Sequence, residues 1–170
     1  MADLMTPPAP PKPAQEHAVA LFGWMEYIGL PQLGLDQVKA KLDTGARTSA
    51  IHAENIELFD KDGVEWVRFQ TLPDWDNPHV GFRSVEAPVV HVREIKNTSG
   101  IPEERLVVKT KARFGKRLWM IDVSLADRTN MSFPMIIGRA ALKNHAVAVH
   151  TRKTFLVSKR PPYSREEEPT

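Results

Sequence analysis

The chain has 170 residues, of which 42% are hydrophobic and 26% charged, a mixture that suits one globular domain with a real core. A net charge of +2 is too small to predict a nucleic-acid-binding surface, and a sequence without cysteine excludes disulfides, thiol catalysis and cysteine-ligated metals. Because no stretch approaches the roughly 20 apolar residues of a membrane helix and the start lacks a signal-peptide pattern, we expect a cytoplasmic protein that binds neither membrane nor nucleic acid.

Both ends of the chain have compositions typical of solvated, disordered tails. Residues 1–18 include the proline-rich run TPPAPPKPA, and residues 160–170 read RPPYSREEEPT, with three consecutive glutamates. Such segments cannot bury enough apolar surface to order themselves. The folded domain is therefore expected over residues 19–159.

Inside this domain, short apolar or alternating runs are separated by turn residues, which predicts β-strands joined by hairpins. Asp62-Gly63 suits a tight hairpin turn because both residues tolerate positive φ angles, and Gly115 suits a second turn. In chain order, the predicted strands and hairpins are WMEYIGL (24–30), QVKAKLD (37–43), IELFDKDGVEWVRFQ (56–70) and ERLVVKTKARFGKRLWMIDVSLA (104–126).

Helical signals are confined to the last part of the domain. GRAALKNH (138–145) is rich in helix formers and is the one convincing helix candidate. AVAVHTRKTFLVS (146–158) then ends the domain with strand-like runs. The predicted fold class is therefore all-β, a closed barrel with one short helix near the C-terminal end.

The segment KLDTGARTS (41–49) places the carboxylate of Asp43 after the apolar Leu42. Asp, Thr and Gly are all common in turns, so this triplet alone more often ends a strand than catalyses a reaction. Catalysis would need a second carboxylate about 3 Å away, because two such groups share one proton and one of them can then activate water. Thr44 could bond a neighbouring loop through its hydroxyl, and Gly45 would let a substrate backbone approach closely.

A second motif, PMIIGRAAL (134–142), changes the interpretation of the first. Together the two motifs resemble those of the retropepsin-like aspartic proteases, in which a D-T-G-A loop precedes an I-I-G-R stretch that leads into a single helix. The resemblance implies an acid-protease barrel from about Trp24 to Val157. It implies three catalytic residues, Asp43, Thr44 and Gly45. It also implies residues that support the catalytic loop from behind: Ile136, Ile137, Gly138 and Arg139.

The same resemblance implies a flap hairpin that folds over the substrate between the two motifs. The candidate is HVREIKNTSGIPEERLVV (91–108), although it lacks the several glycines of retroviral flaps and Pro102 stiffens one arm. The region 73–88 before it looks like an insertion. The residues expected to bind substrate are Ala46, Arg47, Asn97, Thr98, Ser99 and Gly100.

More narrowly, LDTGARTSAIHAENIELF and PMIIGRAAL look like a bacterial branch often labelled "ATP-dependent zinc protease". Some of its members occur beside ATP-grasp ligases that add glutamates to a ribosomal protein. The chain has neither the G-x-x-x-x-G-K-[ST] phosphate loop nor the H-E-x-x-H zinc motif that this label would need. His145 and His150 are five residues apart, so on one strand they would face opposite sides, and the other histidines are scattered. We therefore expect neither a metal nor a cofactor.

A single Asp-Thr-Gly supplies only half of a carboxylate pair, whereas pepsin-type enzymes carry two in one chain. The resemblance thus implies a homodimer, with Asp43 of each copy forming the dyad and a peptide or protein as substrate. By analogy, AVAVH (146–150) and TFLV (154–157) are the candidates for strands at the interface.

Arg47 stands where retroviral proteases have an acidic residue that pairs with the arginine of G-R. Arg139 then needs another partner, for which Asp36 and Glu54 are candidates. Arg47 either faces an acidic substrate or is a solvated surface residue. Two alternatives to a peptidase stay open: a non-catalytic module that binds a protein or peptide, and, more weakly, a metalloprotease.

Overall fold

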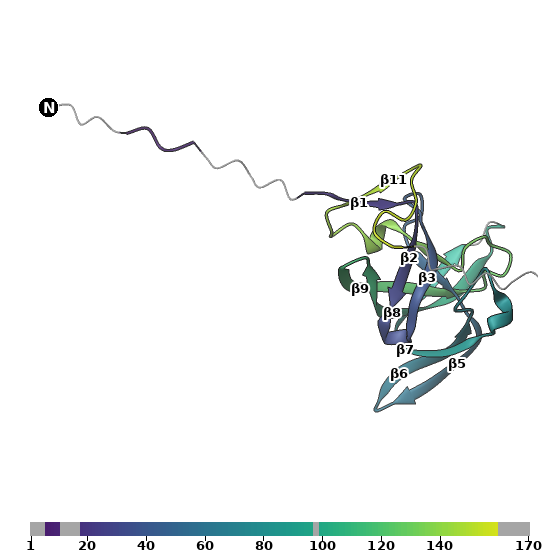
Figure 1. The fold of residues 1–170 in the computed structure, drawn as a ribbon. Helices are drawn as coiled ribbons and strands as arrows, with labels where there is room; N and C mark the ends of the chain where they lie inside the picture. The colour runs from purple at the N-terminus through teal and green to yellow at the C-terminus, as the bar shows by residue number, and fades with distance from the viewer. Residues whose placement is uncertain (1–5, 11–17, 97–98, 160–170) are drawn as a thin grey trace, which may run out of the picture.

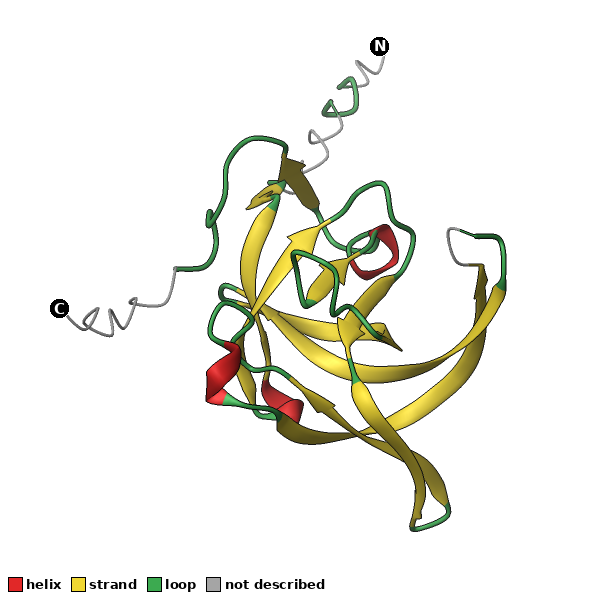
Figure 2. Ribbon diagram, turned by 90° about the vertical axis from the view of Figure 1, so that its right-hand side faces the viewer, coloured by secondary structure: helices red, strands yellow, loops and turns green. Residues whose placement is uncertain are grey.

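The computed structural model describes residues 6–10, 18–96 and 99–159, in which strands predominate (Figures 1 and 2). The strands are β1 (Ala20–Gly23), β2 (Met25–Leu30), β3 (Leu35–Leu42), β4 (Ser49–His52), β5 (Glu54–Lys61), β6 (Val64–Thr71), β7 (Arg83–Lys96), β8 (Pro102–Phe114), β9 (Arg117–Ala126), β10 (Met135–Ile137) and β11 (Val147–His150). Three short 3-10 helices accompany them: η1 (Pro31–Leu33), η2 (Pro78–Val80) and η3 (Arg139–Ala141).

The core of the molecule is a closed barrel. Its strands follow one another in the order β2, β3, β10, β4, β9 and β8, and the pairing of Gly29 with Arg113 joins β8 back to β2. From β8 the sheet continues outward through β7 and β6 to β5, whose hairpin with β6 projects from the barrel (Figure 1). The expected all-β closed barrel is confirmed.

Local sequence signals account for several of these elements. The alternating residues Val38, Ala40 and Leu42 of β3 are buried at 3%, 0% and 3% exposure, as a half-buried strand requires. Asp62 and Gly63 both adopt positive φ angles, 53° and 79°, in the turn between β5 and β6. Both predicted hairpins are therefore present, the second turning at Gly115 between β8 and β9.

The expected flap corresponds to the hairpin of β7 and β8, which are paired antiparallel from Val89–Val108 outward to Lys96–Pro102. Asn97 and Thr98, two of its predicted substrate-binding residues, lie outside the described residues. The region 73–88, expected as an insertion, forms a loop containing η2 and then continues into the first residues of β7. The predicted disordered tails stay predictions, since most of their residues are also outside the described part.

The helix expected over residues 138–145 is much shorter, with only η3 assigned as helix. The N–H groups of Ala141 and Leu142 donate to the carbonyls of Gly138 and Arg139, the i→i−3 pattern of a 3-10 helix. The N–H groups of Arg139 and Ala140 donate to the carbonyls of Ala46 and Arg47, so the start of the segment is tied to the loop after β3. Helix propensity is weak enough for such tertiary context to override it.

The end of the domain also differs from the expectation. AVAVH does form β11, but it pairs in parallel with β1 of the same chain. TFLV forms no strand, because its backbone turns through Phe155 at a φ of 53° and donates to a side chain on β2. The predicted role of both segments at an interface between two copies stays a prediction.

That side chain is Glu26, which is fully buried at 0% exposure. Its Oε1 accepts from the N–H groups of Gly23 at 2.8 Å, Leu156 at 2.7 Å and Val157 at 3.2 Å. Its Oε2 accepts from the N–H of Ser158 at 3.1 Å and from the Ser158 hydroxyl. A buried carboxylate is tolerated only with such compensation, so Glu26 fastens the last segment of the domain to its first strands.

Aromatic rings connect the barrel interior with η3. Phe22, Phe114, Trp119 and His145 form a stacked column whose successive centroids are 5.5, 4.5 and 3.8 Å apart. The Trp119 indole also donates to the carbonyl of Ala141 at 2.9 Å. Within the described residues, no helix has the length and apolar character to cross a bilayer.

Candidate active site

The Asp-Thr-Gly segment forms a tight turn directly after β3. The Asp43 carboxylate accepts the N–H of Gly45 at 3.0 Å, and its carbonyl accepts the N–H of Ala46 at 3.1 Å. Asp43 is half-buried, whereas Thr44, Gly45 and Arg47 are exposed. The turn therefore holds a carboxylate at the surface with its backbone fixed on both sides.

The I-I-G-R segment lies behind this turn and is bonded to it along its length. The N–H of Asp43 donates to the carbonyl of Ile137 at 2.8 Å, and the N–H of Arg139 donates to the carbonyl of Ala46 at 2.9 Å. The Arg139 guanidinium donates through Nη1 to the carbonyl of Thr44, also at 2.9 Å. Among the described residues, the recorded partner of Arg139 is thus a backbone carbonyl, and neither Asp36 nor Glu54.

The contact between the two segments is close enough to require glycine at position 138. A Cβ there would lie 2.5 Å from the carbonyl oxygen of Thr48, a separation that real side chains do not show. The N–H of Gly138 donates to the Ser49 hydroxyl at 3.0 Å, and the Ser124 hydroxyl donates to the Ser49 carbonyl at 3.0 Å. Sequence reasoning missed both serines. The one signal that could have identified them is that each is a hydroxyl residue in a buried strand, where a polar side chain needs a hydrogen-bond partner.

Sequence reasoning also missed Arg128, whose charge interacts with those of Asp43 and Arg105. The Arg128 side chain, on the connection between β9 and β10, donates through Nε to the carbonyl of Phe133 at 2.9 Å. Burial lowers the pKa of Arg128, the Arg105 charge lowers it further, and the Asp43 charge opposes both. The positive charge of Arg128, a residue distant in sequence, therefore acts on the Asp43 carboxylate.

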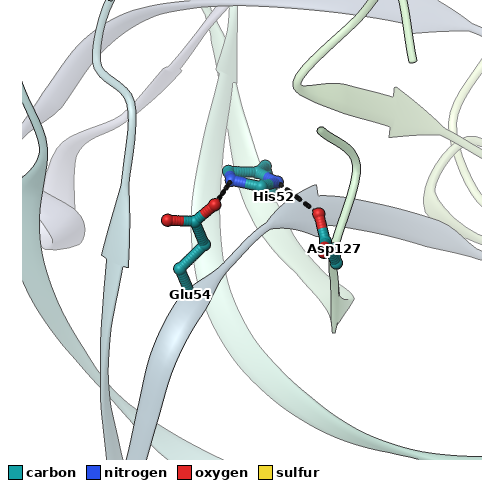
Figure 3. Close-up of side chains that lie close together, drawn as sticks. All are labelled: His52, Glu54 and Asp127. Atoms are coloured by element: carbon teal, nitrogen blue, oxygen red, sulfur yellow. Dashed lines mark ion pairs between the residues drawn. The ribbon is translucent and has the colours of Figure 1, made fainter. Parts of the chain in front are cut away.

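His52 forms a polar cluster with Glu54 and Asp127 beside this connection (Figure 3). The His52 ring is 1% exposed; its Nδ1 accepts the N–H of Arg128 at 2.8 Å, and its Nε2 lies 3.3 Å from Glu54. Asp127 lies 3.8 Å from Nδ1, and the hydroxyl and N–H of Thr129 bond to its carboxylate and lower its pKa.

This cluster tests the expectation that the chain binds no metal. One ligand atom from each of the three residues lies within 4.8 Å of the others, so they could in principle hold an ion. The two carboxylates, however, approach different ring nitrogens (Figure 3). Because Nδ1 already accepts the Arg128 N–H, the arrangement matches that of a buried histidine with its hydrogen bonds satisfied. The absence of a metal stays a prediction.

The remaining predicted substrate residues lie on two separate elements. Ala46 and Arg47 belong to the catalytic turn, and Ser99 and Gly100 lie exposed at the described end of the flap. Together with Asp43, the turn offers one carboxylate, an exposed glycine amide and a threonine hydroxyl. Chemically this is half of an acid–base pair, because the second carboxylate with which the proton would be shared is not part of this turn.

A family model described as "RimB-like: Retropepsin-like aspartic endopeptidase RimB" matches residues 21–160. A "Probable alpha-L-glutamate ligase" of Desulfotalea psychrophila is 38% identical over 134 residues, which are 79% of this chain and 29% of that protein. One of the same name from Parasynechococcus marenigrum is 38% identical over 122 residues, 72% of this chain and 26% of its own. The chain thus spans less than a third of the length of these curated relatives.

The fold is also similar to a solved structure. The crystal structure of Lpg0085 from Legionella pneumophila, a protein described as of unknown function, is 29% identical with a TM-score of 0.71. The similarity covers 83% of this chain and all of that one.

Proposed function

Because the chain belongs to the RimB-like family of retropepsin-like aspartic endopeptidases, we propose that it hydrolyses peptide bonds with water activated by Asp43. The partner carboxylate in this mechanism is Asp43 of a second copy of the chain. The observation that supports the proposal best is the set of backbone bonds by which Ile137 and Arg139 hold the Asp43 turn.

The chemistry requires the two carboxylates to lie close enough to share one proton. The ionised member takes a proton from a trapped water, which attacks the scissile carbonyl, while the protonated member donates to the carbonyl oxygen. The tetrahedral intermediate then collapses: the first carboxyl gives its proton to the leaving nitrogen as the C–N bond breaks, and the second takes back a hydroxyl proton as the carbonyl re-forms. The two groups then titrate as a pair with joint pKa values. The fixed turn contributes by keeping the carboxylate orientation constant through these transfers.

A homodimer is therefore part of the proposal. The exposed Thr44 and Gly45 lie beside Asp43, and in a symmetric pair the two turns would meet at the two-fold axis. Thr44 is suited to bond across that axis because its hydroxyl both donates and accepts.

The substrate class that we propose is an acidic peptide. The curated relatives that match this chain over part of their length are named as probable alpha-L-glutamate ligases, and glutamate carries an acidic side chain. Arg47 is exposed on the catalytic turn, where a guanidinium can bind a carboxylate through two hydrogen bonds.

The test is cleavage of a peptide library that includes glutamate-rich peptides, followed by mass spectrometry over acidic and neutral pH. Asp43→Asn should abolish cleavage, and the matched variant Asp36→Asn, which removes an exposed carboxylate from β3, should retain it. Light scattering should show a dimer under the conditions where cleavage occurs. Cleavage that persists in Asp43→Asn would overturn the proposal.

The alternative is a binding module that keeps the protease fold without catalysis. It predicts a monomer that binds peptides equally well with and without the Asp43 carboxylate, and no cleavage by the native chain. Cleavage that is lost with a chelator but resists pepstatin-type inhibitors would instead indicate the metalloprotease.

A further inference from the structure

Two arginines lie where the flap meets the connection between β9 and β10. The last recorded pair of the β8–β9 ladder is Val107 with Ser124. Arg105 lies two residues beyond Val107 on β8, toward the tip of the flap, and Arg128 lies four residues beyond Ser124, just after the end of β9. The two arginines therefore lie beyond the same end of the β8–β9 ladder, on elements that the sequence separates.

Arg128 is held in place from both ends. Its N–H donates to Nδ1 of the buried His52 at 2.8 Å, and its Nε donates to the carbonyl of Phe133 at 2.9 Å. These bonds fix the backbone and the Nε of Arg128, and within the described residues the terminal Nη groups have no acceptor. A guanidinium restrained in this way loses little entropy when it binds an anion.

Arg105 has unused hydrogen-bonding capacity. Its Nε is buried and has no hydrogen-bond partner among the described residues. Its Nη2 lies 3.5 Å from Glu103, well beyond the roughly 2.7–2.9 Å of a strong charge-assisted bond. Its cross-strand neighbour on β7 is Arg93, another cation, so the flap adds positive charge here.

Placing like charges together in a partly buried position costs free energy. Arg105 and Arg128 lie near enough for the first to lower the pKa of the second, and Asp43 is near enough to oppose that effect. A bound carboxylate would offset the repulsion and supply an acceptor for the unused donors.

We propose that Arg105 and Arg128 form a site beside Asp43 that binds an acidic side chain of the peptide, and that they determine specificity. The inference rests on the proposed function for the position of the peptide, which must pass between the flap and the catalytic turn. In this proposal the β8 arm of the flap contacts the acidic side chain of the peptide through Arg105, in addition to closing over the substrate.

The first experiment measures binding, in the full-length chain carrying Asp43→Asn. The probes are a fluorescent hexaglutamate peptide and its hexaglutamine counterpart, compared by anisotropy at fixed salt. We expect Arg105→Gln and Arg128→Gln each to weaken hexaglutamate binding by about tenfold, as for a lost charge-assisted bond, with little change for hexaglutamine. Arg117→Gln is the matched control, since it removes the same charge at the far end of β9.

Two further variants, Arg105→Lys and Arg128→Lys, test whether a lower hexaglutamate affinity results from misfolding. Each keeps the charge without the planar fork, so each should recover part of the lost affinity, which a fold defect would not allow. Equal hexaglutamate affinity in Arg105→Gln, Arg128→Gln and Arg117→Gln would overturn the inference. So would equal affinity of the Asp43→Asn protein for the two peptides.

The second experiment separates this inference from the proposed function by measuring cleavage with native Asp43. Cleavage without a preference for glutamate over glutamine refutes the arginine site and leaves the peptidase standing. Arginine-dependent binding of hexaglutamate with no cleavage of any peptide refutes the peptidase and leaves the site as part of a binding module.

Discussion

Replacing Glu26 by glutamine should destabilise the domain by about 2–3 kcal/mol. The carboxylate is fully buried and accepts four backbone N–H groups and one hydroxyl, at Gly23 and along residues 156–158. A glutamine has one acceptor oxygen where the carboxylate has two. Its NH2 group would then face the N–H of Ser158, so that two donors oppose each other without an acceptor.

The magnitude follows from two opposing effects. A buried N–H that loses its acceptor costs about 1–3 kcal/mol, and the remaining bonds weaken because their acceptor is no longer charged. Relief from burying a carboxylate offsets part of that loss. For a domain of this size each kcal/mol corresponds to about 2–4 °C in Tm, so a decrease of roughly 4–12 °C is expected.

Thermal and urea unfolding would measure the change, with Glu65→Gln on the exposed side of β6 as the matched control. Hydrogen exchange should also accelerate at the amides of Leu156 and Val157, which lose a charged acceptor. If Glu26→Gln unfolds within 1 °C of Glu65→Gln, the reasoning that this carboxylate fastens the end of the domain is wrong.

Three further predictions concern the site. Gly138→Ala should greatly lower soluble yield and Tm, because the new Cβ would lie 2.5 Å from a backbone oxygen; a normal Tm would contradict this. Arg139→Met should lower the free energy of unfolding by about 1 kcal/mol and the rate of peptide cleavage at least tenfold, because the bond to the Thr44 carbonyl is lost. An unchanged kcat would exclude a positioning role for Arg139. Thr129→Val should raise the pKa of Asp127 toward its usual value, measured by side-chain NMR, since the hydroxyl bond is the main cause that lowers it. Because that pKa is lowered by folding, the associated stabilisation is present above the usual value and is lost as pH falls through the folded pKa, so the variants should converge in strong acid. An Asp127 pKa unchanged in Thr129→Val would refute the assignment.

Features that depend on neighbouring residues could be predicted from the sequence. The alternation of Val38, Ala40 and Leu42 identifies a half-buried strand, and Asp62-Gly63 identifies a hairpin turn, because period and φ preference are local properties. The Asp43 turn and the Gly138 segment were identified through a family resemblance, and their mutual bonding is what the structure adds.

Other features depend on contacts that no local pattern encodes. The partner of Arg139 is a backbone carbonyl, which every residue possesses, so no residue type indicates Thr44. Glu26 bonds to residues about 130 positions away, and in the sequence it is one charged residue in an apolar strand. Arg105 and Arg128 lie beyond the same end of the β8–β9 ladder, which no pattern of residues around either one indicates.

The distance along the chain between Glu26 and its partners has a consequence for biosynthesis. Leu156 is 130 residues further on, so at about 5–20 residues per second a ribosome needs roughly 7–26 seconds to supply it. During that interval β1 lacks β11, and the carboxylate of Glu26 has none of its distal donors. A chain that is truncated before residue 156 could bury Glu26 only without these donors, so we expect its first strands to stay open, with the carboxylate hydrated, until residues 156–158 are available.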